Sequence, residues 1–205
     1  MPVLRDRSGE PGDPHPAPGA RLVILTAHVT PRANLTPDLE AQLRTLLIAA
    51  YPPFADFWAG TSYWGSEPEW HLWLADPAGV PVAQLGCGRR VAEVGGREVT
   101  LVGVGGVATH PAAQRQGVGR RLLRELRAFL LTRPDVEFAF LQCREEVVPF
   151  YESGGFVRVP SPAQYLDPDE GEWVMDTGPT LILPVRAALA EWAVGETVNL
   201  RGTPW

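Results

Sequence analysis

A short loop that carries two glycines is the part of this sequence that could most directly do chemistry. The stretch "HPAAQRQGVGRRLL", His110 to Leu123, follows an apolar run and leads into a helix-like segment. Glycine lets the backbone approach a ligand closely, and the first N–H groups of a helix have no partner within that helix. Such groups at the positive end of a helix bind anions. The loop is therefore either a plain strand-to-helix turn or a cradle for pyrophosphate.

The elements before the loop are mainly strands. Thr36 followed by Pro37 is a helix-start signal and predicts a helix that runs to Ala49. The strands joined by tight turns favour an antiparallel meander. Short apolar and β-branched runs predict the strands themselves, over 21–29, 70–74, 81–91 and 98–109.

Helices and strands alternate after the loop, which makes the chain an α+β protein. Apolar residues at helical spacing predict an amphipathic helix, with arginines on its other face. They are Leu122, Leu123, Leu126, Phe129 and Leu130. Further elements are predicted over 136–142 (strand), 145–152 (short helix), 156–159 (strand) and 180–184 (strand). Residues 1–20, rich in Pro and Gly, are predicted to be a disordered tail, and 21–205 to form a single domain.

Composition excludes several classes of function. A net charge of -6 disfavours a nucleic-acid binder. No apolar run approaches the roughly 18 residues of a membrane span, and the N-terminus lacks the apolar region of a secretory signal. The two cysteines, Cys87 and Cys143, do not suggest a disulfide framework. The four histidines show no metal-ligand spacing, so no metal is expected. A cytoplasmic protein is the expectation.

Two motifs resemble the GNAT superfamily of acyl-CoA-dependent N-acyltransferases. The string "QRQGVG", from Gln114 to Gly119, matches the Q/R-x-x-G-x-G/A pattern of that superfamily between a strand and an amphipathic helix. Some thirty residues later "PFYESGGF", from Pro149 to Phe156, resembles its second signature. The resemblance implies a mixed, mostly antiparallel sheet flanked by helices, and acetyl-CoA or another acyl-CoA as co-substrate.

The segment "EWAVGE", from Glu191 to Glu196, narrows the resemblance. It is similar to the closing segment of the aminoglycoside 2'-N-acetyltransferases and of the nodulation N-acyltransferases. The resemblance implies transfer of an acetyl or longer acyl group to a primary amine, with an amino sugar or aminoglycoside as the favoured acceptor. A non-catalytic acyl-CoA-binding sensor module is the alternative. A homodimer through the last strands is compatible with the exposed-edge character of "TLILP", residues 180–184.

The resemblance also implies roles for individual residues. Tyr151 matches the tyrosine that protonates the departing thiolate, and a tyrosine pKa of ~10 suits general-acid work on a thiol. A backbone N–H near Val107 would face the thioester oxygen, on a strand whose glycines make a bulge plausible. The predicted donor-binding residues are Val107, Ala108 and Thr109 along the strand, and Arg115, Gln116, Gly117, Val118, Gly119 and Arg120 around the pyrophosphate.

The general base is the open point of this resemblance. The aminoglycoside enzymes carry a strand glutamate where this chain has Gly105, and the nodulation enzymes carry one where it has Gly103. Three readings stay open. A residue elsewhere relays the proton through water (Glu98, His71 or His110), the amine arrives neutral, or the acceptor differs altogether.

Two further groups of residues have both a functional and a structural interpretation. The acidic segment "DPDEGEWVMD", from Asp167 to Asp176, is either a solvated loop or an attractor for a cationic amine. A set of aromatic residues forms either core or a stacking floor for a sugar or acyl chain. They are Tyr63, Trp64, Trp70 and Trp73.

Overall fold

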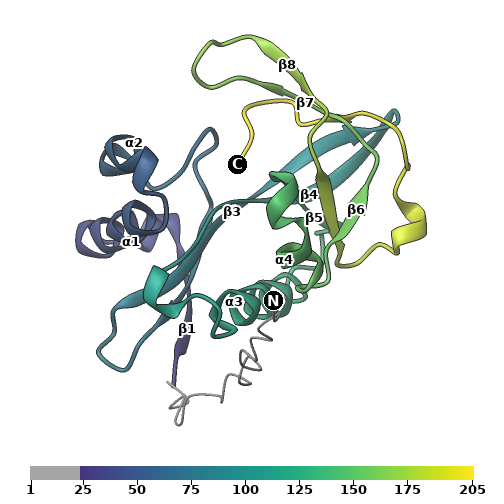
Figure 1. The fold of residues 1–205 in the computed structure, drawn as a ribbon. Coiled ribbons are helices and arrows are strands. Elements are labelled where there is room, and N and C mark those ends of the chain that lie inside the picture. Colours follow the sequence, from purple (N-terminus) through teal and green to yellow (C-terminus); the bar gives the residue numbers. More distant parts are fainter. Residues whose placement is uncertain (1–23) are drawn as a thin grey trace, which may run out of the picture.

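The computed structural model describes residues 24–205, so the tail predicted over 1–20 lies outside the described residues. One mixed sheet runs through the whole of the described chain (Figure 1). Its strands are β1 (Thr26–Pro31), β2 (Trp70–Ala75), β3 (Pro81–Val94), β4 (Arg97–Thr109), β5 (Phe138–Gln142), β6 (Val157–Val159), β7 (Ala163–Leu166), β8 (Trp173–Asp176), β9 (Thr180–Pro184) and β10 (Val198–Asn199).

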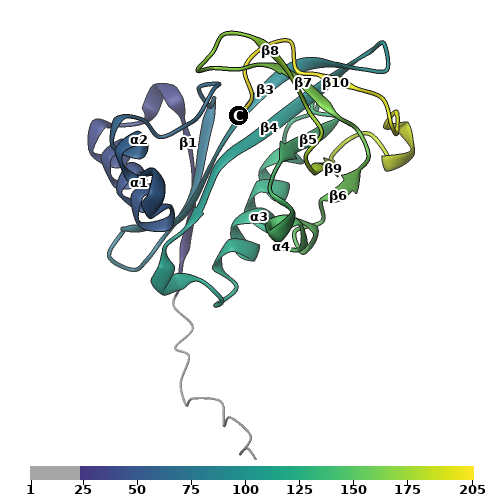
Figure 2. The same cartoon turned by 45° about the horizontal axis from the view of Figure 1, so that its top comes forward.

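The helices are short and lie on both faces of this sheet. Figure 2 shows α1 and α2 on one side of the long strands β3 and β4, and α3 and α4 on the other. The α-helices are α1 (Pro37–Ala50), α2 (Ala55–Gly60), α3 (Val118–Leu130) and α4 (Val148–Glu152). Single 3-10 turns are η1 (Arg32–Asn34), η2 (Pro52–Phe54), η3 (Pro111–Ala113), η4 (Glu145–Val147) and η5 (Leu189–Glu191).

The sheet has the expected mixed, mostly antiparallel character. One path through it runs β6-β9-β5-β4-β3-β10-β7-β8, and β2 joins β1 to β3. The β2–β3–β4 meander is antiparallel, as predicted from the tight turns. Two pairs are parallel, β4 with β5 and β10 with β7. The α+β prediction is therefore confirmed.

Local sequence explains the two principal helices. Thr36 caps α1, because its Oγ1 accepts a hydrogen bond from the Leu39 N–H at 3.3 Å, and Pro37 occupies the first helical position. The α3 helix is amphipathic as predicted, and it buries four of the five expected apolar residues. They are Leu122, Leu123, Leu126 and Leu130.

The hydrophobic core lies on both faces of the sheet. On the α3 face, the leucines of that helix pack with Val102 and Val104 of β4 and with Leu72 of β2. On the opposite face, Leu101 of β4 packs with Phe138 of β5. A third cluster joins α1 to the end of β4 through Ala108. Strand β4 is thus fixed from both sides along its length.

One prediction about the chain's second half needs correction, and four further elements were not predicted. The segment 180–184 forms β9, which pairs with β5 on one side and β6 on the other, so it offers no exposed edge for a dimer. Strands β7, β8 and β10 were not predicted, because they have two to four residues each and depend on long-range pairing. The short helix α2 was not predicted either, and it lies between the helix predicted to end at Ala49 and the strand predicted over 70–74.

Within residues 24–205, no helix has both the length and the apolar character needed to cross a membrane.

Candidate active site

Strands β4 and β5 separate at one end and leave a gap between them. They pair in parallel only from Leu101 with Phe138 to Gly103 with Phe140. Beyond that point β4 continues to Thr109, whereas β5 ends at Gln142 and stays paired with β9. Figure 2 shows the two strands diverging above α3 and α4. The backbone of the last part of β4 therefore has no strand partner on its β5 side.

A β-bulge lies in β4 beside this gap. The pairing register between β3 and β4 shifts, so that Gln84 faces Ala108 while Gly86 faces Gly105. Gly106 and Val107 together stand opposite one residue of β3, and Gly106 has a φ of +56°. Only glycine adopts this left-handed conformation readily, which explains its place at the bulge.

Successive backbone groups of β4 point to alternate edges of the strand. The His110 N–H donates to the Val82 carbonyl of β3 at 2.9 Å, and Ala108 is paired with Gln84 of β3. The backbone groups of Val107 and Thr109 consequently point to the open edge, towards the gap. Of the three predicted strand contacts, these two have the orientation that a bound ligand in the gap could use.

The predicted phosphate loop lies at the end of β4 and opens α3. Gly117 is the residue before the helix and has a φ of +79°, and no side chain caps the first helical N–H groups. The Arg121 N–H is already bonded to the Gly117 carbonyl at 3.0 Å. The N–H groups of Val118, Gly119 and Arg120 precede that first helical bond, and so they remain available to an anion.

Glycine 119 has a packing role in addition. A Cβ atom at this position would lie 2.9 Å from the Phe150 ring of α4. The absent side chain therefore lets α3 and α4 approach each other, which brings the loop towards the helix that carries Tyr151.

Tyr151 lies on α4, among Phe150 and Phe156, with ring centroids 4.9 and 5.9 Å away. Burial raises the pKa of its phenol above the ordinary value, and the neighbouring Tyr51 and Cys143 add to this effect. The hydroxyl consequently stays protonated over the whole neutral range, as a proton donor must.

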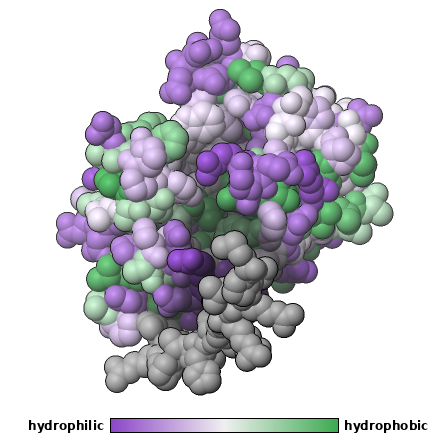
Figure 3. Space-filling view, in the orientation of Figure 1, coloured by the Kyte–Doolittle hydropathy of each residue, from purple (hydrophilic) through white to green (hydrophobic). Residues whose placement is uncertain are grey.

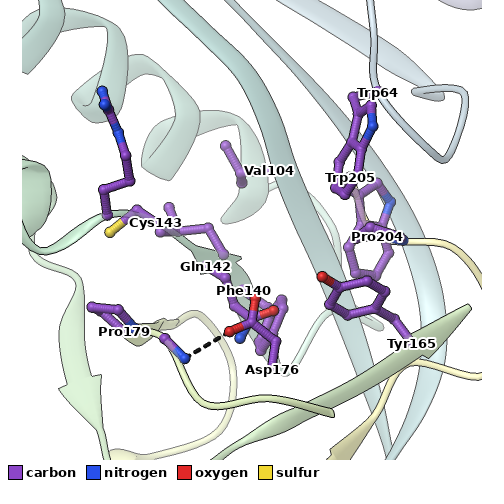
Figure 4. Close-up of a pocket in the computed structure, with 13 residues that line it drawn as sticks. Trp64, Val104, Phe140, Gln142, Cys143, Tyr165, Asp176, Pro179, Pro204 and Trp205 are labelled. Atoms are coloured by element: carbon purple, nitrogen blue, oxygen red, sulfur yellow. Dashed lines mark hydrogen bonds between the residues drawn. The ribbon is translucent and has the colours of Figure 1, made fainter. Parts of the chain in front are cut away.

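A cavity of about 470 Å³ adjoins the gap. Figure 4 shows Trp64, Tyr165 and Trp205 on one side of it, and Gln142, Cys143 and Asp176 across from them. In Figure 3 the molecule is hollowed near the centre of this view, and apolar surface lies at the base of the hollow. Together with Phe140, four aromatic rings and one carboxylate therefore line the same space.

Asp176 is oriented by its own chain. Its Oδ1 accepts a hydrogen bond from the Gly178 N–H at 2.7 Å. It also lies near the phenol of Tyr165, whose pKa is raised by burial and by the carboxylates of Asp176 and Asp167. Another lining residue, Gln142, has a buried side-chain nitrogen without a protein partner. A buried donor of this kind favours a polar ligand in the cavity.

Trp205 explains why strand glutamates are missing from this chain. A Cβ atom at Gly103 would lie 1.7 Å from Cδ2 of the Trp205 indole, and one at Gly105 would lie 2.3 Å from its backbone carbon. Arg90 stacks on the same indole, with its Cζ 4.4 Å from the ring centre, and donates to the Thr203 carbonyl at 2.7 Å. The space that a glutamate would need is filled by this segment.

The three residues considered as proton relays lie in different surroundings. Glu98 is exposed and forms an ion pair with Arg201 at 2.6 Å, and His110 accepts the Ala112 N–H at the start of η3. His71 is fully buried, and neither ring nitrogen has a protein partner. It occupies the same cross-strand row as Gly86 and Gly105. None of the three lines the cavity.

Some of the other candidate residues line the cavity, and the rest pack elsewhere in the fold. Of the four aromatics, Trp64 lines the cavity. Trp70 packs on Phe129 of α3, and Trp73 stacks on His28, so both are structural. The acidic segment forms the turn after β7 and the strand β8, and Asp176 is its one residue that lines the cavity.

Cys143 lines the cavity as a thiol, because burial raises its pKa to about 11. Cys87 is buried in the core. In the described part of the chain, no three His, Cys, Asp or Glu side chains come together as a metal site.

The sequence analysis missed Tyr165, Trp205 and Tyr51 at the site. The glycines at 103 and 105 carried a signal, because glycine inside a strand marks a place where other groups approach closely. The sequence around these two glycines does not indicate which residue packs against them.

Comparisons with known proteins agree with this geometry. The family model described as Nodulation protein A (NodA) matches residues 28–204. Among solved structures, the GNAT family N-acetyltransferase YhbS from Escherichia coli, in complex with CoA, has a TM-score of 0.57 at 15% identity and covers 91% of this chain and 93% of its own. Escherichia coli ElaA has a TM-score of 0.54 at 14% identity, with 78% and 99% covered. A comparison with curated protein sequences finds no significant match. The likeness to these structures establishes the GNAT fold.

Proposed function

Because the chain belongs to the Nodulation protein A family of N-acyltransferases, we propose that it transfers an acyl group from acyl-CoA to the primary amine of an amino sugar. The observation that carries the proposal is the gap between β4 and β5, with the predicted phosphate loop at the end of β4 and an aromatic cavity lined by residues of both strands. The donor thioester belongs in the gap, and the acceptor belongs in the cavity.

The loop suits the pyrophosphate of the donor. The N–H groups of Val118, Gly119 and Arg120 lie at the positive end of α3, and Gly117 leaves open space beside them. Arg115 and Gln116 belong to the same loop, and the guanidinium of Arg120 adds positive charge. Further along the donor, the open-edge backbone of Val107 and Thr109 suits the amides of its pantetheine arm.

The proposed reaction forms one C–N bond and breaks one C–S bond. A cationic amine first gives one proton to water, and the neutral nitrogen then attacks the thioester carbon. The Val107 N–H stabilises the negative charge that develops on the carbonyl oxygen. As the C–S bond breaks, the Tyr151 hydroxyl gives its proton to the sulfur, which leaves as the CoA thiol. The nitrogen loses one proton to water and becomes an amide, and Tyr151 is reprotonated from solvent.

The acceptor cavity supports a polar ring compound that carries an amine. The faces of Trp64, Tyr165 and Trp205 offer stacking surfaces, while the Asp176 carboxylate attracts a cationic group. The Gln142 amide adds a buried hydrogen-bond donor for a hydroxyl or carbonyl group. Sugar amines combine these three features, whereas an apolar amine would leave Asp176 and Gln142 without partners.

Thiol release from acetyl-CoA, measured against a panel of amines, tests the proposal. The panel contains glucosamine, deacetylated chitobiose, an aminoglycoside, spermidine and a peptide amine, and N-acetylglucosamine is the blocked control. Turnover with sugar amines and none with the blocked control is the expected result. Turnover with the peptide amine alone would overturn the sugar assignment.

A silent panel is resolved by two further measurements. Longer acyl-CoA donors are tested next, and donor binding is measured by calorimetry. If acyl-CoA binds and no donor of any length gives turnover, the protein is a binding or sensor module. Absence of acyl-CoA binding would reject the proposed function altogether.

A further inference from the structure

Tyr51 reaches the open edge of β4 from the opposite side of the sheet. It follows α1 directly, and its own N–H donates to the Leu47 carbonyl at 2.8 Å. Its ring lies 6.3 Å from that of Trp58 in α2. The hydroxyl donates a hydrogen bond to the carbonyl of Val107. A residue 56 positions away in sequence thus binds the bulge of β4.

If β5 continued beside β4, one of its N–H groups would donate a hydrogen bond to the Val107 carbonyl. The alternation of backbone groups along β4 directs it to the β5 side, where β5 has already separated. The Thr109 carbonyl, the next on this edge, is held in a comparable way by the Gln114 amide at 3.1 Å. The outward carbonyls of Val107 and Thr109 therefore both accept hydrogen bonds from side chains. The N–H groups of the same two residues point to the same open edge of β4.

Tyr51 and Tyr151 approach the gap from opposite faces of the sheet. Tyr51 comes from the α1 side and Tyr151 from the α4 side. Tyr51 contributes to the raised pKa of Tyr151, after the larger effect of burial. Arg144, which lines the cavity, acts in turn on Tyr51 and opposes the rise in pKa that burial causes there. The Tyr51 hydroxyl is bonded to the same Val107 peptide whose N–H is proposed to face the thioester oxygen.

The bulge needs such an external contact because of its glycine. Gly106 precedes Val107 and has a φ of +56°, and a glycine peptide is free to adopt many other conformations. The direction of the Val107 N–H depends on the dihedral angles of these two residues. A hydrogen bond that holds the Val107 carbonyl restricts those angles.

We propose that Tyr51 is a positioning residue, which aligns the Val107 peptide so that its N–H faces the thioester oxygen of the donor. The inference rests on the proposed function, since it assumes a donor thioester in the gap. It assigns to Tyr51 no contact with the reacting atoms. Its effect is on the polarisation of the thioester carbonyl, and only a small effect on overall donor affinity is expected.

Acetyl-CoA labelled with carbon-13 at the carbonyl tests the inference without any knowledge of the acceptor. Bound to the full chain, its carbonyl resonance shifts from the value in free solution if an N–H polarises it. The test variant is Tyr51→Phe, which keeps the ring against Trp58 and removes the hydroxyl. The matched control is Tyr63→Phe, because it also removes one tyrosine hydroxyl, whereas the bond to the Val107 carbonyl comes from Tyr51. Melting temperature and the dissociation constant of acetyl-CoA are measured for each protein.

The expected result is a shifted resonance in the wild type and in Tyr63→Phe, and a resonance close to the free value in Tyr51→Phe. The dissociation constant should stay within about threefold, because the lost hydrogen bond is internal to the protein and makes no contact with the donor. Where an amine is turned over, kcat should fall about tenfold while the KM of the amine is unchanged.

Each of the other outcomes would reject either the inference alone or the proposed function together with it. An unchanged resonance in Tyr51→Phe would reject the positioning role and leave the proposed function intact. A wild-type resonance at the free value would reject polarisation by Val107, and the inference with it. A wild type that binds neither acetyl-CoA nor a longer acyl-CoA would reject the proposed function itself, and the inference would then fall with it.

Discussion

The indole of Trp205 covers Gly103 of β4 so closely that a Cβ atom on Gly103 would lie 1.7 Å from the ring. Real Cβ atoms do not approach other atoms to this distance, so any side chain at position 103 must displace the indole. The contact joins the last residue in the sequence given to the strand at the centre of the site. It also forms one wall of the cavity.

Gly103→Ala should destabilise the protein and open the cavity. Overpacking of this kind costs about 1–3 kcal/mol, because the ring and the Arg90 stack have to move. Thermal unfolding measures the loss. Gly60→Ala is the control, since a Cβ atom there would meet nothing within 4 Å. Equal melting temperatures for the two variants would show that Trp205 does not occupy this position in solution.

Tyr151→Phe should lower kcat about 100-fold and leave the dissociation constant of CoA unchanged, because only the proton donor is lost. The raised pKa has a consequence for the pH profile. Since the phenol stays protonated in the folded protein, the rate should not decline through Tyr151 ionisation as the pH rises to about 10. Its contribution to stability is fully present below the unfolded value of about 10 and declines as the pH rises above it. Steady-state rates from pH 6 to pH 10 (~1-unit steps) provide the measurement.

His71 should make the protein sensitive to acid. Burial lowers its pKa from 6.5 to about 4, with Arg32 acting in the same direction and Glu40 and Glu67 against it. A lowered pKa means that the stabilisation is fully present above 6.5 and is lost as the pH falls towards 4. The full loss is roughly 3.5 kcal/mol below that pH, at about 1.4 kcal/mol for each pKa unit.

The variant His71→Leu removes this titration. Its melting temperature should fall less than that of the wild type between pH 7 and pH 4, whatever its absolute stability at pH 7. Parallel curves for the two proteins would contradict the lowered pKa of His71.

Gly117→Ala should weaken CoA binding. With a φ of +79° at this position, an alanine is strained by about 1–2 kcal/mol, and the loop relieves the strain by moving its N–H groups. Calorimetry should show a dissociation constant about tenfold higher. The matched control is Gly171→Ala in the β7–β8 turn, where φ is +71° and a Cβ atom also meets nothing within 4 Å. If both variants bind CoA as the wild type does, the loop is a structural turn.

Asp176→Asn should raise the KM of a cationic amine about tenfold, because a hydrogen bond to a charged group contributes about 1.5–3 kcal/mol. kcat should change little, since the carboxylate attracts the acceptor and has no assigned part in proton transfer. Asp169→Asn in the exposed turn of the same hairpin is the control. Equal KM values for the two variants at low ionic strength would exclude Asp176 from acceptor binding.

Local physics accounts for what could be read from the sequence. The Thr36–Pro37 start of α1 and the leucine periodicity of α3 were predicted, and both helices form as expected. The order of strand, loop and helix around Gly117 also follows from neighbouring residues alone. The family resemblance rested on three short motifs, at 114–119, 149–156 and 191–196, and the match over residues 28–204 bears it out.

What the sequence by itself determined is therefore the α+β class, the principal elements and the likeness to the GNAT superfamily. Capping, periodicity and turn chemistry act between residues that are close in the chain. Tertiary structure decided the site. Trp205 meets Gly103, Tyr51 meets Val107, and the two-residue strand β10 pairs with both β3 and β7 only when distant segments have packed. These contacts depend on three-dimensional proximity, which no spacing in the sequence encodes.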